Sequence, residues 1–304
     1  MIPIIYGPTG VGKTELMIKV CEKIGCEIIS LDSRQIYKYM DIGTAKPTPE
    51  EREKVPHHMI DILYPDEYYN AYIYRKDSLK WVERIRERAG IPVFVGGTGL
   101  YVDALVRGIF EGVPADENVR RELKRLHEQE PGILRRMLED IDPEAAERIH
   151  PNDLKRTIRA LEVYMKTGRR ISELQKKAEP AGRFRIIILF RERKDLYERI
   201  NVRAETMVKR GLVEEVKRLL EMGYTEDLNS MRTIGYRETI DYIKGKYDYD
   251  HYLHVLKRNT RHFARRQIIW ARRYGNAVKI NLTFEKEPVG RLVEMVEKTL
   301  EEEV

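Results

Sequence analysis

Short apolar runs alternate with amphipathic stretches over the first hundred residues of the chain. Residues 2–6, 27–31 and 92–95 are apolar runs of strand length, while a helical pattern begins at Lys13 and another runs through residues 78–88. Strands that alternate with helices in this way form a parallel sheet covered by helices. The pattern therefore predicts an α/β fold.

A further apolar run at residues 185–190 predicts another buried strand of the same sheet. After this strand we expect a mainly helical C-terminal region. Gly211, Gly223 and Gly235 are the expected breaks between its helices, because glycine commonly ends or separates helical segments.

The segment of residues 113–177 differs from the rest because it is rich in charge and has no strand pattern. Helix starts are expected near Asp116 and Asp142, since aspartate is a preferred N-cap residue. We therefore expect residues 1–112 and 178–304 to form the core and residues 113–177 to form an all-helical insertion.

Residues 7–14 read GPTGVGKT and lie between the first predicted strand and a helix, which is the context that the phosphate-binding P-loop requires. The backbone amides, the helix N-terminus and Lys13 can hold a diphosphate or triphosphate, and the hydroxyl of Thr14 can ligate Mg²⁺. The core is thus expected to be P-loop NTPase-like. The motif alone does not establish ATP as the ligand. The predicted phosphate-binding residues are Gly7, Pro8, Thr9, Gly10, Val11, Gly12, Lys13 and Thr14.

Two polar residues follow other predicted strands of this sheet. Asp32 comes directly after residues 27–31, and Thr98 follows the glycine turn after residues 92–95. Ligands of open α/β sheets bind at the carboxyl ends of the strands, so both side chains are candidates for the site. Asp32 could instead be a helix cap or a magnesium ligand, and Thr98 could be a turn hydroxyl that satisfies nearby backbone groups.

Charge is distributed unevenly along the 304 residues, whose net charge is +6. No acidic residue occurs from position 251 to position 284, where basic and aromatic side chains alternate. This combination suits phosphate contacts and base stacking in nucleic-acid binding. An amphipathic surface helix of a charge-rich protein would look the same. The residues concerned are Lys257, Arg258, Arg261, His262, Phe263, Arg265, Arg266, Trp270, Arg272, Arg273, Tyr274 and Lys279.

The two cysteines, Cys21 and Cys26, are surrounded by no Cys/His cluster, so neither a zinc site nor a disulfide framework is expected. We expect two reduced thiols in a cytoplasmic protein. The sequence shows no signal peptide and no apolar run of membrane-spanning length, so no membrane association is expected.

Seven segments, in order along nearly the whole chain, resemble the tRNA dimethylallyltransferase (tRNA isopentenyltransferase) family, bacterial type. They are GPTGVGKT, DSRQIYKYMDIGTAKP, PHHMIDI, VFVGGTGLYVDAL, HPNDLKRTIRALEVY, RTIGYRE and RRQIIWARR. The resemblance implies transfer of a dimethylallyl group from dimethylallyl diphosphate to N6 of the adenosine 3′-adjacent to the tRNA anticodon, with release of diphosphate. It also implies that residues 113–177 grip the anticodon stem.

The resemblance implies roles for single residues. Asp32 corresponds to the general base, and Thr98, Lys13 and Arg203 complete the catalytic set. Arg203 is expected to clamp the diphosphate, although Arg199 could do so instead. Mg²⁺ is the expected cofactor, the anticodon stem-loop of tRNA is the expected partner, and a monomer without protein partners is expected. The implied tRNA contacts are Asp32, Ser33, Arg34, Gln35, Thr98, Arg120, Lys155, Arg156, Thr157, Ile158, Arg159, Arg232, Arg237, Arg265, Arg266, Gln267, Trp270 and Arg272.

Other functions are compatible with parts of the sequence. A P-loop kinase acting on a small metabolite or nucleoside would explain the first hundred residues, with Asp32 activating a hydroxyl and Arg203 as a lid arginine. It would give no reason for the acid-free basic segment. An RNA-binding protein with a nucleotide switch and a prenyltransferase acting on free AMP or ADP are further alternatives. The basic surface favours tRNA as the acceptor.

Overall fold

The computed structural model describes residues 1–110 and 112–302. These residues form two compact units, Met1–Val102 with Gly182–Val304, and Asp103–Ala181. The second unit contains the segment 113–177 that the sequence sets apart. Each unit has its own hydrophobic core.

Six strands of the first unit form one sheet, and every strand pair in it is parallel. This confirms the predicted α/β fold with a parallel sheet. The spatial order is β3-β2-β4-β1-β5-β6. The strands are β1 (Ile2–Tyr6), β2 (Cys26–Leu31), β3 (His57–His58), β4 (Ile91–Gly96), β5 (Phe184–Phe190) and β6 (Val278–Asn281).

The described chain after residue 190 is mainly helical, as expected, and strand β6 is an element of this region that the sequence did not predict. It has four residues, of which only Ile280 is buried, while Lys279 is exposed. Such a short edge strand carries too few buried positions to give an apolar run. It pairs with β5 in parallel, from Val278 opposite Ile187 to Asn281 opposite Phe190.

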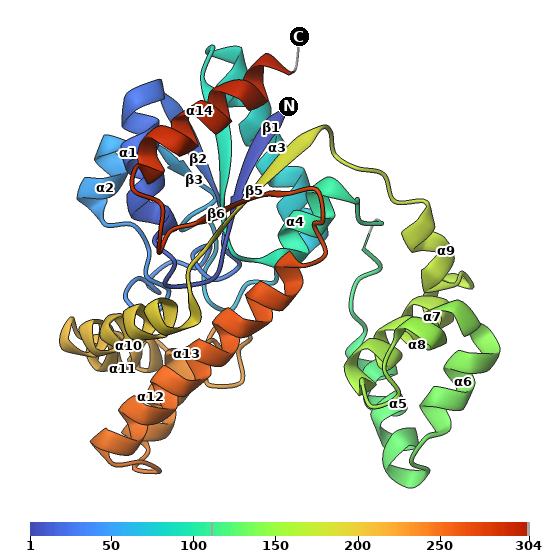
Figure 1. Cartoon of the computed structure of the whole chain (residues 1–304). Coiled ribbons are helices and arrows are strands. Elements are labelled where there is room, and N and C mark those ends of the chain that lie inside the picture. Colours follow the sequence, from blue (N-terminus) through green and yellow to red (C-terminus); the bar gives the residue numbers. More distant parts are fainter. Residues whose placement is uncertain (111, 303–304) are drawn as a thin grey trace. The chain divides into compact units, whose positions relative to one another are not determined.

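Helices cover both faces of the sheet because successive strand residues point to opposite sides. On one face Ile5, Val93 and Ile187 pack against α1 (Lys13–Ile24) and α14 (Pro288–Glu301), which lie together in Figure 1. Helix α3 (Ala71–Glu87) contacts β2 and β4, and the hydroxyl of its buried Tyr74 donates to the Ser30 carbonyl of β2. Two further helices of the chain are α2 (Pro49–Lys54) and α4 (Gly99–Val106).

Four helices lie beyond the carboxyl ends of the strands (Figure 1). They share a second core with Ile36, Tyr37 and Met40 from the segment that follows β2. Gly211 and Gly235 precede two of these helices with φ of 98° and 100°, which confirms the expected breaks. The helices are α10 (Arg193–Lys209), α11 (Leu212–Glu221), α12 (Tyr236–Ile243) and α13 (Tyr249–Ala271).

The second unit is helical, and its hydrophobic core includes Leu123, Leu138 and Leu161. Asp116 caps the first helix by accepting from the amides of Asn118 and Val119, and Asp142 caps another, as the sequence predicts. The helices of this unit after α4 are α5 (Glu117–Gln129), α6 (Ile133–Ile141), α7 (Pro143–Arg148), α8 (Leu154–Thr167) and α9 (Ile171–Lys176).

The expectation of two reduced thiols is wrong, because Cys21 and Cys26 form a disulfide. Gly25 ends α1 with φ of 70°, and this tight reversal brings the last turn of α1 to the first residue of β2, with the two cysteine Cα atoms 4.4 Å apart. The bond is buried and ties the P-loop helix to the neighbouring strand. Among the described residues, no helix is both long and apolar enough to cross a membrane.

Candidate active site

The P-loop between β1 and α1 is held by its own lysine. Lys13 Nζ donates to the carbonyls of Gly7 at 2.7 Å and Pro8 at 2.9 Å. Gly10 and Gly12 have φ of 80° and 104°, which side chains rarely adopt. The carbonyls of Gly7 and Pro8 therefore face the lysine, and the N-terminus of α1 is left to face an anion.

Two arginines hold the outer carbonyls of the same loop. Arg199 Nε donates to Gly10 O at 3.0 Å, and Arg191 Nε donates to Val11 O at 2.9 Å. Arg191 also pairs with Asp195 at 2.9 Å. The sequence reasoning missed Arg191, although its place immediately after a predicted strand of the sheet could have indicated it.

Lys13, Arg203 and Asp32 influence one another electrostatically at the carboxyl end of the sheet. Burial lowers the pKa of Lys13 to about 7, with a further lowering by Arg203 and an opposing effect of Asp32. Burial also lowers the pKa of Arg203, while Asp32 opposes this shift. Both candidate arginines lie near this charge cluster, because Arg199 also lowers the pKa of Arg203, and Arg199 in addition donates to the loop backbone.

Asp32 is half-buried and follows β2. Its Oδ1 accepts from the amides of Arg34 at 2.8 Å and Gln35 at 3.3 Å. These two hydrogen bonds resemble those of a helix cap, which is one of the roles that the sequence allows for Asp32. Within the described part of the chain, its Oδ2 has no hydrogen bond, so the same carboxylate can also accept a proton from a substrate.

Thr98 lies beside Asp32 because β4 and β2 are neighbours in the sheet. Its Oγ1 accepts from the Ser33 amide at 3.0 Å, and its own amide donates to the Leu31 carbonyl at 3.0 Å. Thr98 is therefore a turn residue that fixes the segment carrying Asp32. The structure brings both strand-end candidates together.

The segment after Asp32 is anchored by buried polar side chains. Glu215 of α11 accepts from the amides of residues 41–43, with distances of 2.8 to 3.1 Å, and from the hydroxyl of Tyr236 at 2.6 Å. Gln35 Nε2 donates to the Ala45 carbonyl at 3.1 Å, and Ser30 Oγ donates to Gln35 Oε1 at 3.2 Å. Both ends of the Gln35 side-chain amide thus form hydrogen bonds within the protein.

One face of α13 and the residues directly after this helix pack on the turn after β4. Gln267 is 7% exposed and Tyr274 is 6% exposed, and the Tyr274 hydroxyl donates to the Gly99 carbonyl at 3.3 Å. A Cβ on Gly99 would lie 2.3 Å from the ring of Trp270, so only glycine fits there. The predicted tRNA contact through the Gln267 side chain does not agree with this burial.

The basic residues predicted to contact tRNA lie on other faces of the same unit. Arg34 is half-buried and donates to the Asn229 carbonyl at 3.0 Å. Five arginines expose their side chains, as contacts with a polyanion require, although Arg232 pairs with Asp227 at 3.3 Å and Arg237 pairs with Glu238 at 2.7 Å. They are Arg232, Arg237, Arg265, Arg266 and Arg272.

In the helical unit the predicted contacts divide into two groups. Lys155 and Arg156 are exposed at the start of α8. Thr157 and Ile158 are buried in the core, 2% and 6% exposed, so a side-chain contact of these two with tRNA is not compatible with the structure. The helix period explains this, since consecutive residues point in different directions around α8.

The last two predicted contacts of the helical unit, Arg120 and Arg159, are half-buried and share one partner. Both pair with the buried carboxylate of Glu162, Arg120 Nε at 2.9 Å and Arg159 Nη1 at 2.5 Å. The two guanidinium groups therefore balance a buried charge inside the unit, and only their partly exposed edges face solvent.

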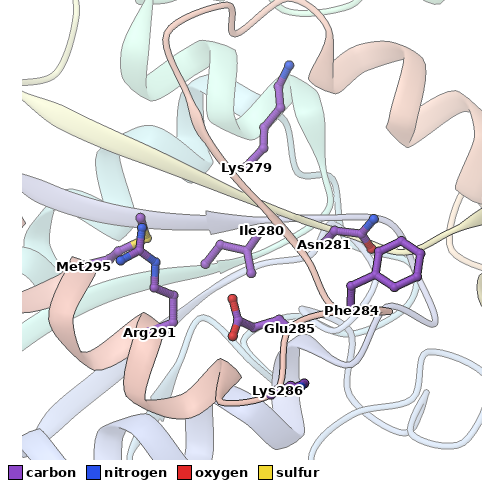
Figure 2. Close-up of a pocket in the computed structure, with 8 residues that line it drawn as sticks. All are labelled: Lys279, Ile280, Asn281, Phe284, Glu285, Lys286, Arg291 and Met295. Atoms are coloured by element: carbon purple, nitrogen blue, oxygen red, sulfur yellow. The ribbon is translucent and has the colours of Figure 1, made fainter.

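A pocket of about 480 Å³ lies along β6 and the first turns of α14 (Figure 2). Ile280, Phe284 and Met295 supply its apolar lining, and Lys279, Lys286 and Arg291 supply its basic lining. Its lining comes from residues 279–295 only and includes neither Lys13 nor Asp32.

The protein oxygens near the P-loop suit a magnesium ion that would be coordinated mainly by phosphate oxygens of the bound diphosphate. Among the described residues, no group of three or more His, Cys, Asp or Glu side chains could hold a metal ion. Thr14 offers a half-buried hydroxyl in the first turn of α1. Mg²⁺ typically uses one or two protein oxygens together with phosphate oxygens and water, so the residues fit it.

Known proteins match this chain along nearly its whole length. A family model described as IPP transferase matches residues 35–274, and one described as Isopentenyl transferase matches residues 1–61. The tRNA dimethylallyltransferase of Thermotoga petrophila is 70% identical over 301 residues, which are 99% of this chain and 98% of the relative. That of Thermosipho melanesiensis is 60% identical over 280 residues, which are 92% of this chain and 93% of the relative.

Solved structures agree. The tRNA isopentenylpyrophosphate transferase of Bacillus halodurans superposes with a TM-score of 0.73 at 37% identity and covers 99% of this chain and 97% of its own. A eukaryotic dimethylallyltransferase acting on tRNA gives a TM-score of 0.82 at 27% identity, covering 99% of this chain and 79% of its own. With these matches and the geometry above, the chain belongs to the IPP transferase family, the tRNA dimethylallyltransferases.

Proposed function

We propose that this protein transfers a dimethylallyl group from dimethylallyl diphosphate to N6 of the adenosine 3′-adjacent to the anticodon in tRNA, and releases diphosphate. The observation that carries this proposal is the grouping of Lys13, Arg203 and Asp32 at the carboxyl end of the sheet. Two cations beside a phosphate-binding loop suit a departing diphosphate. A carboxylate with one unused oxygen suits proton removal.

The acceptor step needs a base because the lone pair of an exocyclic adenine amine is delocalised into the ring. The amine nitrogen forms a bond to the allylic carbon while the bond from that carbon to the diphosphate oxygen breaks. The electron pair of the broken bond leaves with the diphosphate, and Asp32 accepts the amine proton. General-base catalysis by a positioned side chain contributes about 10²- to 10⁴-fold in rate.

The donor step needs positive charge where the diphosphate develops negative charge. The free amides at the start of α1, Lys13 and Arg203 supply it within a partly desolvated site. Mg²⁺, held by Thr14 and the diphosphate oxygens, would neutralise further charge on the leaving group. The protein residues bind and orient the donor so that its allylic carbon faces Asp32.

The tRNA is bound by exposed cations. Arg265 and Arg266 of α13, Arg272 directly after this helix, and Arg232 lie in the same unit as the P-loop. Lys155 and Arg156 of the helical unit are proposed to grip the anticodon stem. The target adenosine must leave its stack to reach Asp32, which costs a few kcal/mol that these contacts offset. The enzyme is proposed to act in the cytoplasm as a monomer.

The test is to incubate the purified protein with Mg²⁺, radiolabelled dimethylallyl diphosphate and unmodified tRNA, and to count label in precipitated RNA. Label in tRNA without added ATP, and no transfer when AMP replaces tRNA, is the expected result. Label on AMP would indicate a free-nucleotide acceptor. No transfer at all, together with ATP-dependent phosphorylation of a small molecule, would support the kinase alternative.

A further inference from the structure

Gln267 uses both ends of its side-chain amide to join two loops of the active site. Its Oε1 accepts from the backbone amide of Thr9 at 2.8 Å, and its Nε2 donates to the carbonyl of Gly97 at 2.8 Å. Thr9 belongs to the P-loop, and Gly97 belongs to the turn that ends β4. A single side chain from α13 thus connects the diphosphate cradle with the turn beside Asp32.

The connection continues from that turn to the proposed general base. Thr98 follows Gly97 and accepts from the amide of Ser33 at 3.0 Å. Ser33 is the residue after Asp32. The path from the cradle to the base therefore runs through the buried amide of Gln267, the turn at Gly97 and the hydroxyl of Thr98. Its three hydrogen bonds, at 2.8, 2.8 and 3.0 Å, have normal lengths.

The surroundings of Gln267 keep it in this position. A Cβ on Gly97 would lie 2.3 Å from Gln267 Nε2, so this turn approaches the amide closely because it has no side chain. The buried hydroxyl of Tyr6 donates to the Gln267 carbonyl at 3.1 Å. To contact a nucleotide, the amide would have to leave the part-buried amide of Thr9 and the buried carbonyl of Gly97, and both backbone groups would lose their hydrogen-bond partner.

We propose that Gln267 is a positioning residue, which sets the separation between the diphosphate cradle and Asp32 and makes no contact with tRNA. This inference rests on the proposed transfer reaction. The allylic carbon held by the cradle and the amine beside Asp32 must meet within bonding approach. A misplacement of about 1 Å is sufficient to cost a reaction about 10²-fold in rate, so the bridge acts on turnover and leaves substrate affinity unchanged.

The experiment is steady-state kinetics of Gln267→Met, which has a similar length and no hydrogen-bonding amide. We expect kcat to fall about 10- to 100-fold, while KM for both substrates and the Kd for tRNA stay within about threefold. Gln267→Asn keeps the amide but is one methylene shorter and can reach one partner, so its kcat should be intermediate. His254→Ala, an exposed position on the same helix, should match the unchanged protein.

Arg266→Ala serves as the comparison for a true tRNA contact and should raise KM for tRNA with little change in kcat. If Gln267→Met behaves in that way, or if none of its constants changes, the positioning role is wrong. Thermal unfolding of each variant checks that it folds, and Gln267→Asn decides by the same criteria if Gln267→Met does not fold. Failure of the unchanged protein to label tRNA would refute the proposed function instead.

Discussion

Thr98 accepts a hydrogen bond from the backbone amide of Ser33 at 3.0 Å, and this contact joins the end of β4 to the residue after Asp32. Asp32 follows β2, which is the neighbour of β4 in the sheet. The contact therefore fixes the segment that carries Asp32 to the sheet. We therefore expect the hydroxyl of Thr98 to act on the reaction through the backbone that it holds.

Replacing Thr98 by Val removes the acceptor while keeping the shape of the side chain. One lost hydrogen bond of about 1–1.5 kcal/mol corresponds to a fall in kcat of about tenfold. Thr98→Ser keeps the hydroxyl and should stay within about threefold of the unchanged enzyme. Single-turnover rates of label transfer measure this difference. Equal rates for Thr98→Val and Thr98→Ser would show that the hydroxyl has no positioning role.

Asp32→Asn separates the two roles of this carboxylate. Asparagine keeps an oxygen that can accept from the amides of Arg34 and Gln35, but it cannot accept the amine proton. We expect kcat to fall by about 10² to 10⁴, with the Kd for tRNA in a filter-binding assay within about twofold. A loss of tRNA affinity as large as the loss of turnover would make Asp32 a binding residue and not a base.

Lys13 should make donor binding dependent on pH. With a pKa of about 7 in the free protein, Lys13 loses its proton as the pH rises through 7, whereas the diphosphate binds the charged form. Binding therefore takes up a proton, and affinity for the donor should fall about tenfold from pH 6 to pH 8 beyond the change caused by the donor's own ionisation.

Lys13→Arg is the matched control for this prediction, because arginine stays charged over the whole range. Its donor affinity should follow only the ionisation of the ligand. Calorimetric titrations at fixed Mg²⁺, in two buffers with different heats of ionisation, count the protons taken up. Identical pH profiles for the two proteins would mean that Lys13 is already charged in the free protein at pH 8.

Glu215→Gln should destabilise the fold. The buried carboxylate accepts from three consecutive amides and from Tyr236, and an NH₂ group in place of one oxygen would face donors. Stranding one or two donors lowers the free energy of unfolding by about 1–3 kcal/mol each. Urea denaturation measures this change in the free energy of unfolding. The exposed neighbour Glu214→Gln should change it by less than about 0.5 kcal/mol, and an equal effect of the two substitutions would contradict this account.

The parts of the fold and site that could be predicted are those with a local signature. The P-loop has fixed spacing, and Asp32 directly follows an apolar run, so both could be placed from the sequence alone. β6 could not, since only Ile280 of its four residues is buried. The Cys21–Cys26 disulfide could not either, because two cysteines alone do not indicate how closely a turn brings them together.

The long-range contacts of the site were not predictable for a different reason. Gln267 lies 258 residues from Thr9, and Glu215 lies 172 residues from Gly43, and only the packing of α11 and α13 at the strand ends brings them together. The motif RRQIIWARR indicated that Gln267 is functionally important, but it did not indicate whether its side chain faces the protein interior or the solvent. The structure shows that Gln267 is buried while Arg265 and Arg266 of the same helix are exposed. Gln267 is therefore suited to a positioning role, and the two arginines are suited to surface contacts with tRNA.

The central claim is that this site couples the departure of diphosphate to the formation of a C–N bond on one adenosine of tRNA. The most direct measurement is the ratio of diphosphate released to N6-dimethylallyladenosine formed, with the modified nucleoside located by nuclease mapping and mass spectrometry. A ratio of one, with the modification confined to the adenosine 3′-adjacent to the anticodon, is the predicted result. Diphosphate release without this nucleoside, or modification spread over other adenosines, would contradict the account.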